Sequence, residues 1–216
     1  ISGATVDVAL LITADSAASG STDGMYLCKG ASVSFSKLVF SVPTAMGTRC
    51  ALFECRSSTL KVDGCGVSEM NEGNGIGCSF VVVSGTGDVQ LTTLTISGVT
   101  FNNAPAIDIR SGGSPTCTLS SSSLKSVGSS GSSVGLLSVG SGGSLIVTLT
   151  EIEDTLANTK TVVRGVDGKR IEIGKSNVTG HTRSSGNGGL VSLSYGIVSE
   201  CVVLFDHSTL SGGEVT

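Results

Sequence analysis

The chain has 216 residues, of which 39% are hydrophobic and only 14% charged, and its formal net charge is −4. The 13 lysines and arginines are scattered, which argues against a nucleic-acid partner, and no apolar run approaches the length of a membrane-spanning helix. No stretch carries an apolar stripe of helical period, and the 31 glycines would weaken any helix. The composition therefore predicts one elongated all-β domain over residues 1–216.

One apolar pattern recurs along the whole chain about every 28 residues. It reads apolar-x-apolar-x-x-small-x-apolar, and it is clearest at residues 94–101. Successive copies start 27, 27, 34, 23, 28, 26 and 32 residues apart, and a repeat of this length is typical of a stacked solenoid. The core positions of the eight copies, in chain order, are Val6, Val8, Leu11 and Thr13; Val33, Phe35, Leu38 and Phe40; Leu60, Val62, Cys65 and Val67; Leu94, Ile96, Val99 and Phe101; Cys117, Leu119, Ser122 and Leu124; Leu145, Val147, Thr150 and Ile152; Ile171, Ile173, Ser176 and Val178; and Val203, Phe205, Ser208 and Leu210.

Each copy also carries a second short apolar run, usually followed by a Gly/Ser-rich turn. Several alternate like a half-buried strand, and the runs lie at residues 26–28, 53–55, 80–82, 107–109, 137–139, 162–163 and 191–193. Such units bury their apolar faces only by stacking, which predicts a right-handed parallel β-helix of about eight coils. A β-sandwich is the rival fold, although it does not require apolar positions to repeat with constant internal spacing. The Ser/Gly-rich stretch at 120–133 is predicted to be a long loop within a coil.

The seven cysteines are informative through their spacing. Cys28 and Cys55 are 27 residues apart, and Cys50 and Cys78 are 28 apart, so each pair is predicted to lie on neighbouring coils. Equivalent positions one coil apart are about 4.8 Å from each other, a separation that a disulfide can span. Two alternatives stay open, cross-coil disulfides or an interior ladder of free thiols. Cys65 and Cys117 are predicted to be buried thiols, and the spacings do not favour a zinc site.

Asn177 begins an Asn-Val-Thr glycosylation triplet and is predicted to face outward from a strand. Serine-rich segments at 120–123 and 129–133 would suit O-linked glycans. Together with the cysteines, these features favour an extracellular or cell-surface location.

Glu54 and Asp108 are the best candidates for catalytic side chains. They are predicted to face outward in one column, two coils and about 10 Å apart, and glycoside hydrolysis needs two carboxyl groups at comparable separation. A second acidic group contains Glu151, Glu153, Asp154 and Glu172. Against catalysis, the chain has no Trp and two Tyr, so it lacks the aromatic platforms that usually hold sugar rings.

The two histidines are not predicted to be catalytic. His207 follows Asp206 and precedes Ser208, but the repeat directs Ser208 inward and His207 outward, so the three side chains diverge. His181 is predicted to lie in a loop. Rows of threonine, the device of ice-binding β-helices, are not indicated, because the threonines at 92–95 and 148–150 do not repeat in one column.

Residues 94–101, the following residues 102–109 and the Ser-Gly-Gly-Ser segment at 111–114 resemble the pectin-lyase-like right-handed β-helix repeats of large surface proteins. The Ser/Gly-rich style is similar to that of large protein families of anaerobic protists. A looser likeness is to bacterial polymorphic outer-membrane proteins, but their Phe-x-x-Asn segment is not kept after Phe101. The resemblance implies the fold and a surface location, and it implies no particular activity.

The sequence thus predicts a non-catalytic structural or adhesive module, such as a rigid stalk or filament subunit, that needs no cofactor. The alternative is a carbohydrate-active enzyme, a polysaccharide lyase or glycoside hydrolase, acting through Glu54 and Asp108. Expected partners are further copies joined end to end, flanking β-helix coils, or surface glycans. Neither residues 1–4 nor residues 211–216 resemble a cap, so we expect a section of a longer protein whose ends are covered.

Overall fold

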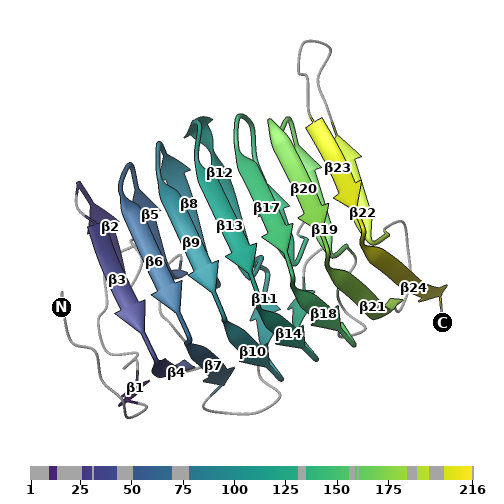
Figure 1. The fold of residues 1–216 in the computed structure, drawn as a ribbon, viewed down its shortest axis with the longest axis horizontal. Coiled ribbons are helices and arrows are strands. Elements are labelled where there is room, and N and C mark those ends of the chain that lie inside the picture. The colour runs from purple at the N-terminus through teal and green to yellow at the C-terminus, as the bar shows by residue number, and fades with distance from the viewer. Residues whose placement is uncertain are drawn as a thin grey trace.

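The computed structural model consists of β-strands stacked into a solenoid whose coils follow one another along one axis (Figure 1). It describes residues 10–13, 26–30, 32–42, 51–69, 78–130, 135–155, 159, 161–183, 189–194 and 202–215. Within these ranges the chain forms strands and turns without a helix, as the composition predicts. Consequently, this part of the chain holds no helix that is long and apolar enough to cross a membrane.

Three parallel sheets run along the solenoid, and they hold seven, seven and eight of the described strands. In spatial order, the first sheet contains β2 (Tyr26–Lys29), β5 (Ala51–Arg56), β8 (Ser79–Gly85), β12 (Ile107–Gly113), β16 (Leu137–Val139), β19 (Val163–Val166) and β22 (Val191–Ser194). The second contains β3 (Ser32–Ser36), β6 (Thr59–Asp63), β9 (Asp88–Thr92), β13 (Thr116–Ser120), β17 (Ser144–Thr148), β20 (Arg170–Gly174) and β23 (Val202–Asp206). The third contains β1 (Leu10–Thr13), β4 (Leu38–Val42), β7 (Gly66–Glu69), β10 (Thr95–Ser97), β14 (Ser123–Lys125), β18 (Glu151–Glu153), β21 (Asn177–Arg183) and β24 (Thr209–Val215). A two-stranded sheet pairs β11 (Thr100–Asn102) with β15 (Gly128–Ser130).

The coils wind in a right-handed sense. Figure 1 shows them progressing from the N-terminal end at the left, with the second sheet running downward in front and the chain returning upward through the first sheet behind. Right-handed crossovers are the rule for parallel strands because of the strand twist. The predicted right-handed parallel β-helix with coils of about 28 residues is therefore confirmed.

The core consists of columns of inward side chains, each column containing one residue from every coil. In two columns of the second sheet, the five middle members are buried and the outer members are partly or largely exposed. Burying one such side chain stabilises the fold by about 1.5–3 kcal/mol, so the stack is stabilised along its whole length. The two columns are Val33, Leu60, Val89, Cys117, Leu145, Ile171 and Val203; and Phe35, Val62, Leu91, Leu119, Val147, Ile173 and Phe205.

These columns correct the predicted fourth copy of the repeat. The residue that pairs with Leu60 and Cys117 is Val89, not Leu94, so the copy starts five residues earlier than predicted. The error arose because the next corner of the coil has the same spacing: Leu94 and Ile96 are followed by an inward Val99 after a left-handed Gly98. With Val89 in place, the irregular intervals of 34 and 23 residues become 29 and 28.

The corner between the second and third sheets is made by one left-handed residue in each coil. Seven residues with φ between 47° and 61° occupy it, and only one is glycine. In six of them the backbone N–H donates a hydrogen bond to a carbonyl oxygen of the next coil, so the corner extends the inter-coil ladder. They are Lys37, Gly64, Thr93, Ser121, Leu149, Lys175 and His207.

Three local predictions were wrong. The stretch at 120–133 is not one long loop, because its described part contains β14 and β15 and buries Leu124 and Val127. In the first copy Leu10 and Ile12 pair with Leu38 and Phe40, one residue from the predicted register, because consecutive apolar residues do not select a face; its Val6 and Val8 lie outside the described residues. In β8, Val81 rather than Phe80 aligns with Phe53, since residues 79–83 are buried on both faces and show no alternation.

Candidate functional site

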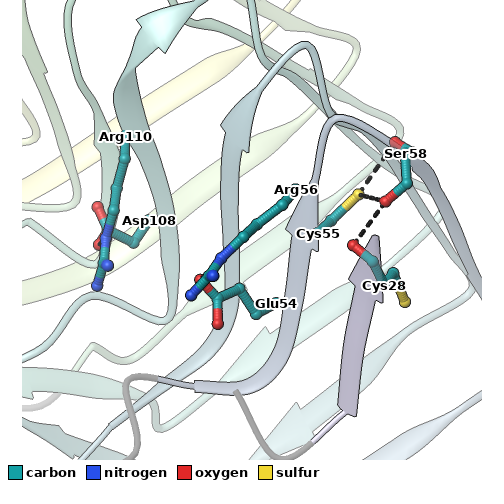
Figure 2. Close-up of polar contacts among 7 residues, drawn as sticks. All are labelled: Cys28, Glu54, Cys55, Arg56, Ser58, Asp108 and Arg110. Carbon is teal, nitrogen blue, oxygen red and sulfur yellow. Dashed lines mark hydrogen bonds and ion pairs between the residues drawn. The ribbon is translucent and has the colours of Figure 1, made fainter. Parts of the chain in front are cut away.

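The two predicted catalytic carboxylates lie in one column of the first sheet, as expected. Glu54 and Asp108 both pair with Val82, which stands between them on the middle coil. Each carboxylate binds the arginine two residues further along its own strand, at 2.6 Å for Glu54–Arg56 and 2.8 Å for Asp108–Arg110 (Figure 2). The two ion pairs thus have the same arrangement within their strands and lie two coils apart.

Glu54 is not on the surface of the rod, contrary to the prediction. Its side chain is 3% exposed, and Val82 beside it is fully buried. A buried carboxylate requires a compensating charge, and Arg56 supplies it. A hydrolytic pair would need one carboxyl group held protonated and both within reach of a sugar, whereas here each is matched to a cation. Both carboxylates thus lie in ion pairs with an arginine of their own strand.

The second acidic group is divided between two sheets. Glu151 and Glu153 lie on β18 in the third sheet, but Glu172 lies on β20 in the second sheet and forms an ion pair with Arg170. Glu153 lies 3.6 Å from the ammonium group of Lys125 on the preceding coil. The structure therefore does not gather these carboxylates into one constellation.

The two histidines occupy different environments. His207 is exposed and contacts Asp206 at 2.5 Å, so these two side chains do not diverge as predicted. Ser208 directs its hydroxyl to the carbonyl oxygen of Ile173, so its predicted separation from His207 is confirmed. His181, however, is not in a loop. It lies in β21, is 1% exposed, and its Nδ1 is 2.6 Å from the hydroxyl of Thr155. The missed signal was its position three residues after Val178, which matches Val99 three residues after Ile96.

Cys28 and Cys55 are directly paired in register, which confirms the predicted column. Both are buried free thiols, as are Cys65 and Cys117. Cys50 lies outside the described residues, so its pairing with the buried Cys78 stays a prediction. Burial raises the pKa of the Cys28, Cys65 and Cys117 thiols, and the neighbouring Cys55 adds to this effect at Cys28 and, after Asp88, at Cys117.

Ser58 connects the two cysteine-bearing strands, and sequence analysis did not single it out. Its hydroxyl donates to the carbonyl oxygen of Cys28 at 2.7 Å, and the sulfur of Cys55 donates to the carbonyl oxygen of Ser58 at 3.1 Å (Figure 2).

Asn177, the predicted glycan acceptor, is exposed on β21 beside the buried Val178, which is the orientation that attachment requires.

The last coil presents an apolar end surface. Four of the six large hydrophobic side chains that are exposed in the described ranges lie on its strands β22 and β23. Among the described strands, these and β24 are the last members of their sheets, and each has one hydrogen-bonded neighbour. The four residues, called the C-terminal end surface below, are Leu193 and Phe205, which continue inward columns, and Val202 and Leu204, which lie on the outer face of β23.

Among the described residues, no group of three or more His, Cys, Asp or Glu side chains is arranged to hold a metal ion. No protein-family model, curated protein or solved structure matches the chain.

Proposed function

We propose that the chain is a non-catalytic structural or adhesive β-helix module of an extracellular or cell-surface protein, serving as a rigid stalk or filament subunit. The observation that carries the proposal is the continuous parallel ladder. All three sheets pass through the described coils without a change of direction, and their interior columns are apolar. Such a stack resists bending and stretching because each coil is joined to its neighbours by three sets of backbone hydrogen bonds.

The polar features of the rod also support a structural role. The Glu54–Arg56 and Asp108–Arg110 pairs hold charges within or near the wall, and the five cysteines in the described ranges are buried. An exposed Asn177 on the outer wall suits a glycosylated surface protein. The C-terminal end surface, with Leu193 and Phe205 at the end of inward columns, suits a further β-coil stacked on it, either a flanking part of the same protein or another copy.

Force spectroscopy tests this function directly. The chain would be held through cysteine-free handles fused at its two ends and stretched along the rod axis. We expect stepwise rupture, with each released coil of about 28 residues adding about 95 Å of contour length at roughly 3.4 Å per residue. Loss of the whole structure in one low-force event would contradict the rigid-stalk role. Release of reducing sugar from a polysaccharide panel, abolished by Asp108→Asn, would instead establish the carbohydrate-active alternative.

A further inference from the structure

We propose that Cys28 and Cys55 form a disulfide under oxidising conditions and that this bond locks strand β2 onto the next coil. The inference concerns a covalent modification site and holds whether or not the module is a stalk.

The register places the two cysteines opposite each other. Their Cα positions are direct partners in the parallel pairing of β2 with β5, and both side chains face the buried interior. Paired positions on adjacent parallel strands are about 4.8 Å apart, within the range of roughly 4.4–6.8 Å found for disulfides. Cys117, by contrast, is paired with Val89 and Leu145, so it has no cysteine on either neighbouring strand.

In the reduced state the two sulfurs are turned apart. Figure 2 shows the sulfur of Cys55 directed at Ser58, where it donates to the carbonyl oxygen at 3.1 Å and lies 3.4 Å from the hydroxyl. The same hydroxyl holds the carbonyl oxygen of Cys28 at 2.7 Å. Bond formation requires the Cys55 side chain to leave Ser58 and rotate toward Cys28, which is a change of rotamer without a change of strand register.

The location explains what the bond would do. Among the described strands β2 is the first of its sheet and pairs only with β5, so it has one hydrogen-bonded neighbour where inner strands have two. Outer elements open locally at lower free-energy cost than the core. A covalent link from β2 to β5 would suppress this opening at the position where the ladder is weakest.

The chemistry follows thiol–disulfide exchange with a small-molecule disulfide, for which we take oxidised glutathione. Because both thiols are buried, the reaction proceeds when β2 is open and the thiols reach solvent. One cysteine thiolate attacks a glutathione sulfur and releases one glutathione thiolate; the second cysteine thiolate then attacks the mixed disulfide and releases the other. Two electrons pass from the cysteines to glutathione, and the two protons given up by the cysteines protonate the two released thiolates.

Peptide mapping tests the pairing on the 216-residue chain. The protein is refolded with oxidised and reduced glutathione, alkylated while denatured and unreduced, and cut after Lys, Arg and Glu. The cuts separate Cys28 (residues 1–29), Cys50 (50–54), Cys55 (55–56), Cys65 (62–69) and Cys78 (73–110). We expect peptide 1–29 joined to 55–56. Alkylation of Cys28, or a disulfide that links Cys28 or Cys55 to Cys50 or Cys117, would overturn the proposal.

Amide hydrogen exchange provides an independent readout of the lock. Oxidation should slow exchange across β2 at least about tenfold in the natural sequence and in Cys117→Ser, and should leave it unchanged in Cys28→Ser and Cys55→Ser. If the serine variants do not fold, the mapping of the natural sequence decides alone. If oxidation slowed hydrogen exchange across β2 equally in Cys28→Ser, it would act at another site, and the proposal would be wrong.

Discussion

The hydroxyl oxygen of Ser176 accepts a hydrogen bond at 3.1 Å from the backbone N–H of Thr150 on the preceding coil. It also donates to the carbonyl oxygen of Gly174 at 2.8 Å. Ser122 and Ser208 repeat the arrangement, accepting from the N–H groups of Leu94 and Ser176 and donating to carbonyl oxygens two residues earlier. These hydroxyls line the corner between the second and third sheets and satisfy backbone groups where the chain turns away from the strand ladder.

Replacing Ser176 with Ala should lower the free energy of unfolding by about 1–3 kcal/mol, because the substitution removes a buried partner from a backbone N–H and a carbonyl group. Urea unfolding followed by circular dichroism measures the change. Ser192→Ala, at an exposed position of β22, is the matched control and should cost less than about 0.5 kcal/mol. Equal losses in the two variants would show that the corner hydroxyls are not structural.

How far the sequence predicts this fold depends on how sharply each segment distinguishes its two faces. Where apolar and polar residues alternate, as in β13 and β17, the register was predicted correctly. Where both faces are buried, as in β8, or where two corners share one spacing, as at Leu94, the pattern does not specify the register. In such segments the register is determined by pairing with the neighbouring coils, and the local sequence does not contain that information.

The candidate site shows the same division. The shared column of Glu54 and Asp108 followed from the repeat, because a column depends only on residue spacing. The burial of Glu54 and the contact between His181 and Thr155 did not, since these depend on which side chains meet in three dimensions. The repeat also directed Ser176 inward but gave no sign that its hydroxyl serves the preceding coil.

Phe101 and Thr100 test the inward register of β11. Phe101 is 1% exposed and Thr100 lies on the opposite face of the strand. Phe101→Ala should therefore cost about 3–5 kcal/mol, as truncations of large core side chains do, and Thr100→Ala less than about 1 kcal/mol. Chemical denaturation of both variants measures the difference. Similar costs would mean that the faces of this strand are exchanged.

Leu149 combines a left-handed backbone with a 59% exposed apolar side chain. Non-glycine residues are disfavoured in this conformation, so Leu149→Gly should raise the free energy of unfolding by about 0.5–1 kcal/mol after allowing for the greater freedom of glycine in the unfolded chain. Gly64 occupies the same corner position with φ 61°, and a Cβ there would meet only ordinary contacts with Lys37. Gly64→Ala should thus lower the free energy of unfolding. Thermal unfolding of the two variants measures both changes in stability. A lower stability of Leu149→Gly would contradict the inference that the left-handed backbone of Leu149 is strained.

The C-terminal end surface should drive association of the isolated 216-residue chain. Val202 and Phe205 are 61% and 44% exposed on β23, which ends the second sheet. An open strand edge beside apolar side chains is a template for another chain, and contacts that do not close into a ring propagate into a fibre. Light scattering and electron microscopy should show concentration-dependent association that the double variant Val202→Lys/Leu204→Lys reduces. A strictly monomeric natural sequence at high concentration would rule out end-to-end assembly.

Thr155 and His181 form a polar pair in a corner that other coils fill with valine. The equivalent positions, reached after the left-handed Gly98 and Ser126, are Val99 and Val127, and both are fully buried. Thr155→Val removes the 2.6 Å contact to the Nδ1 of His181, so it should cost about 1–3 kcal/mol because a buried polar group loses its partner. Adding His181→Val removes both partners and restores the apolar column, so the double variant should match or exceed the stability of the natural sequence. A double-mutant cycle by urea unfolding measures the coupling, which should be about 0.5–3 kcal/mol. Strictly additive losses would show that the pair contributes through packing alone.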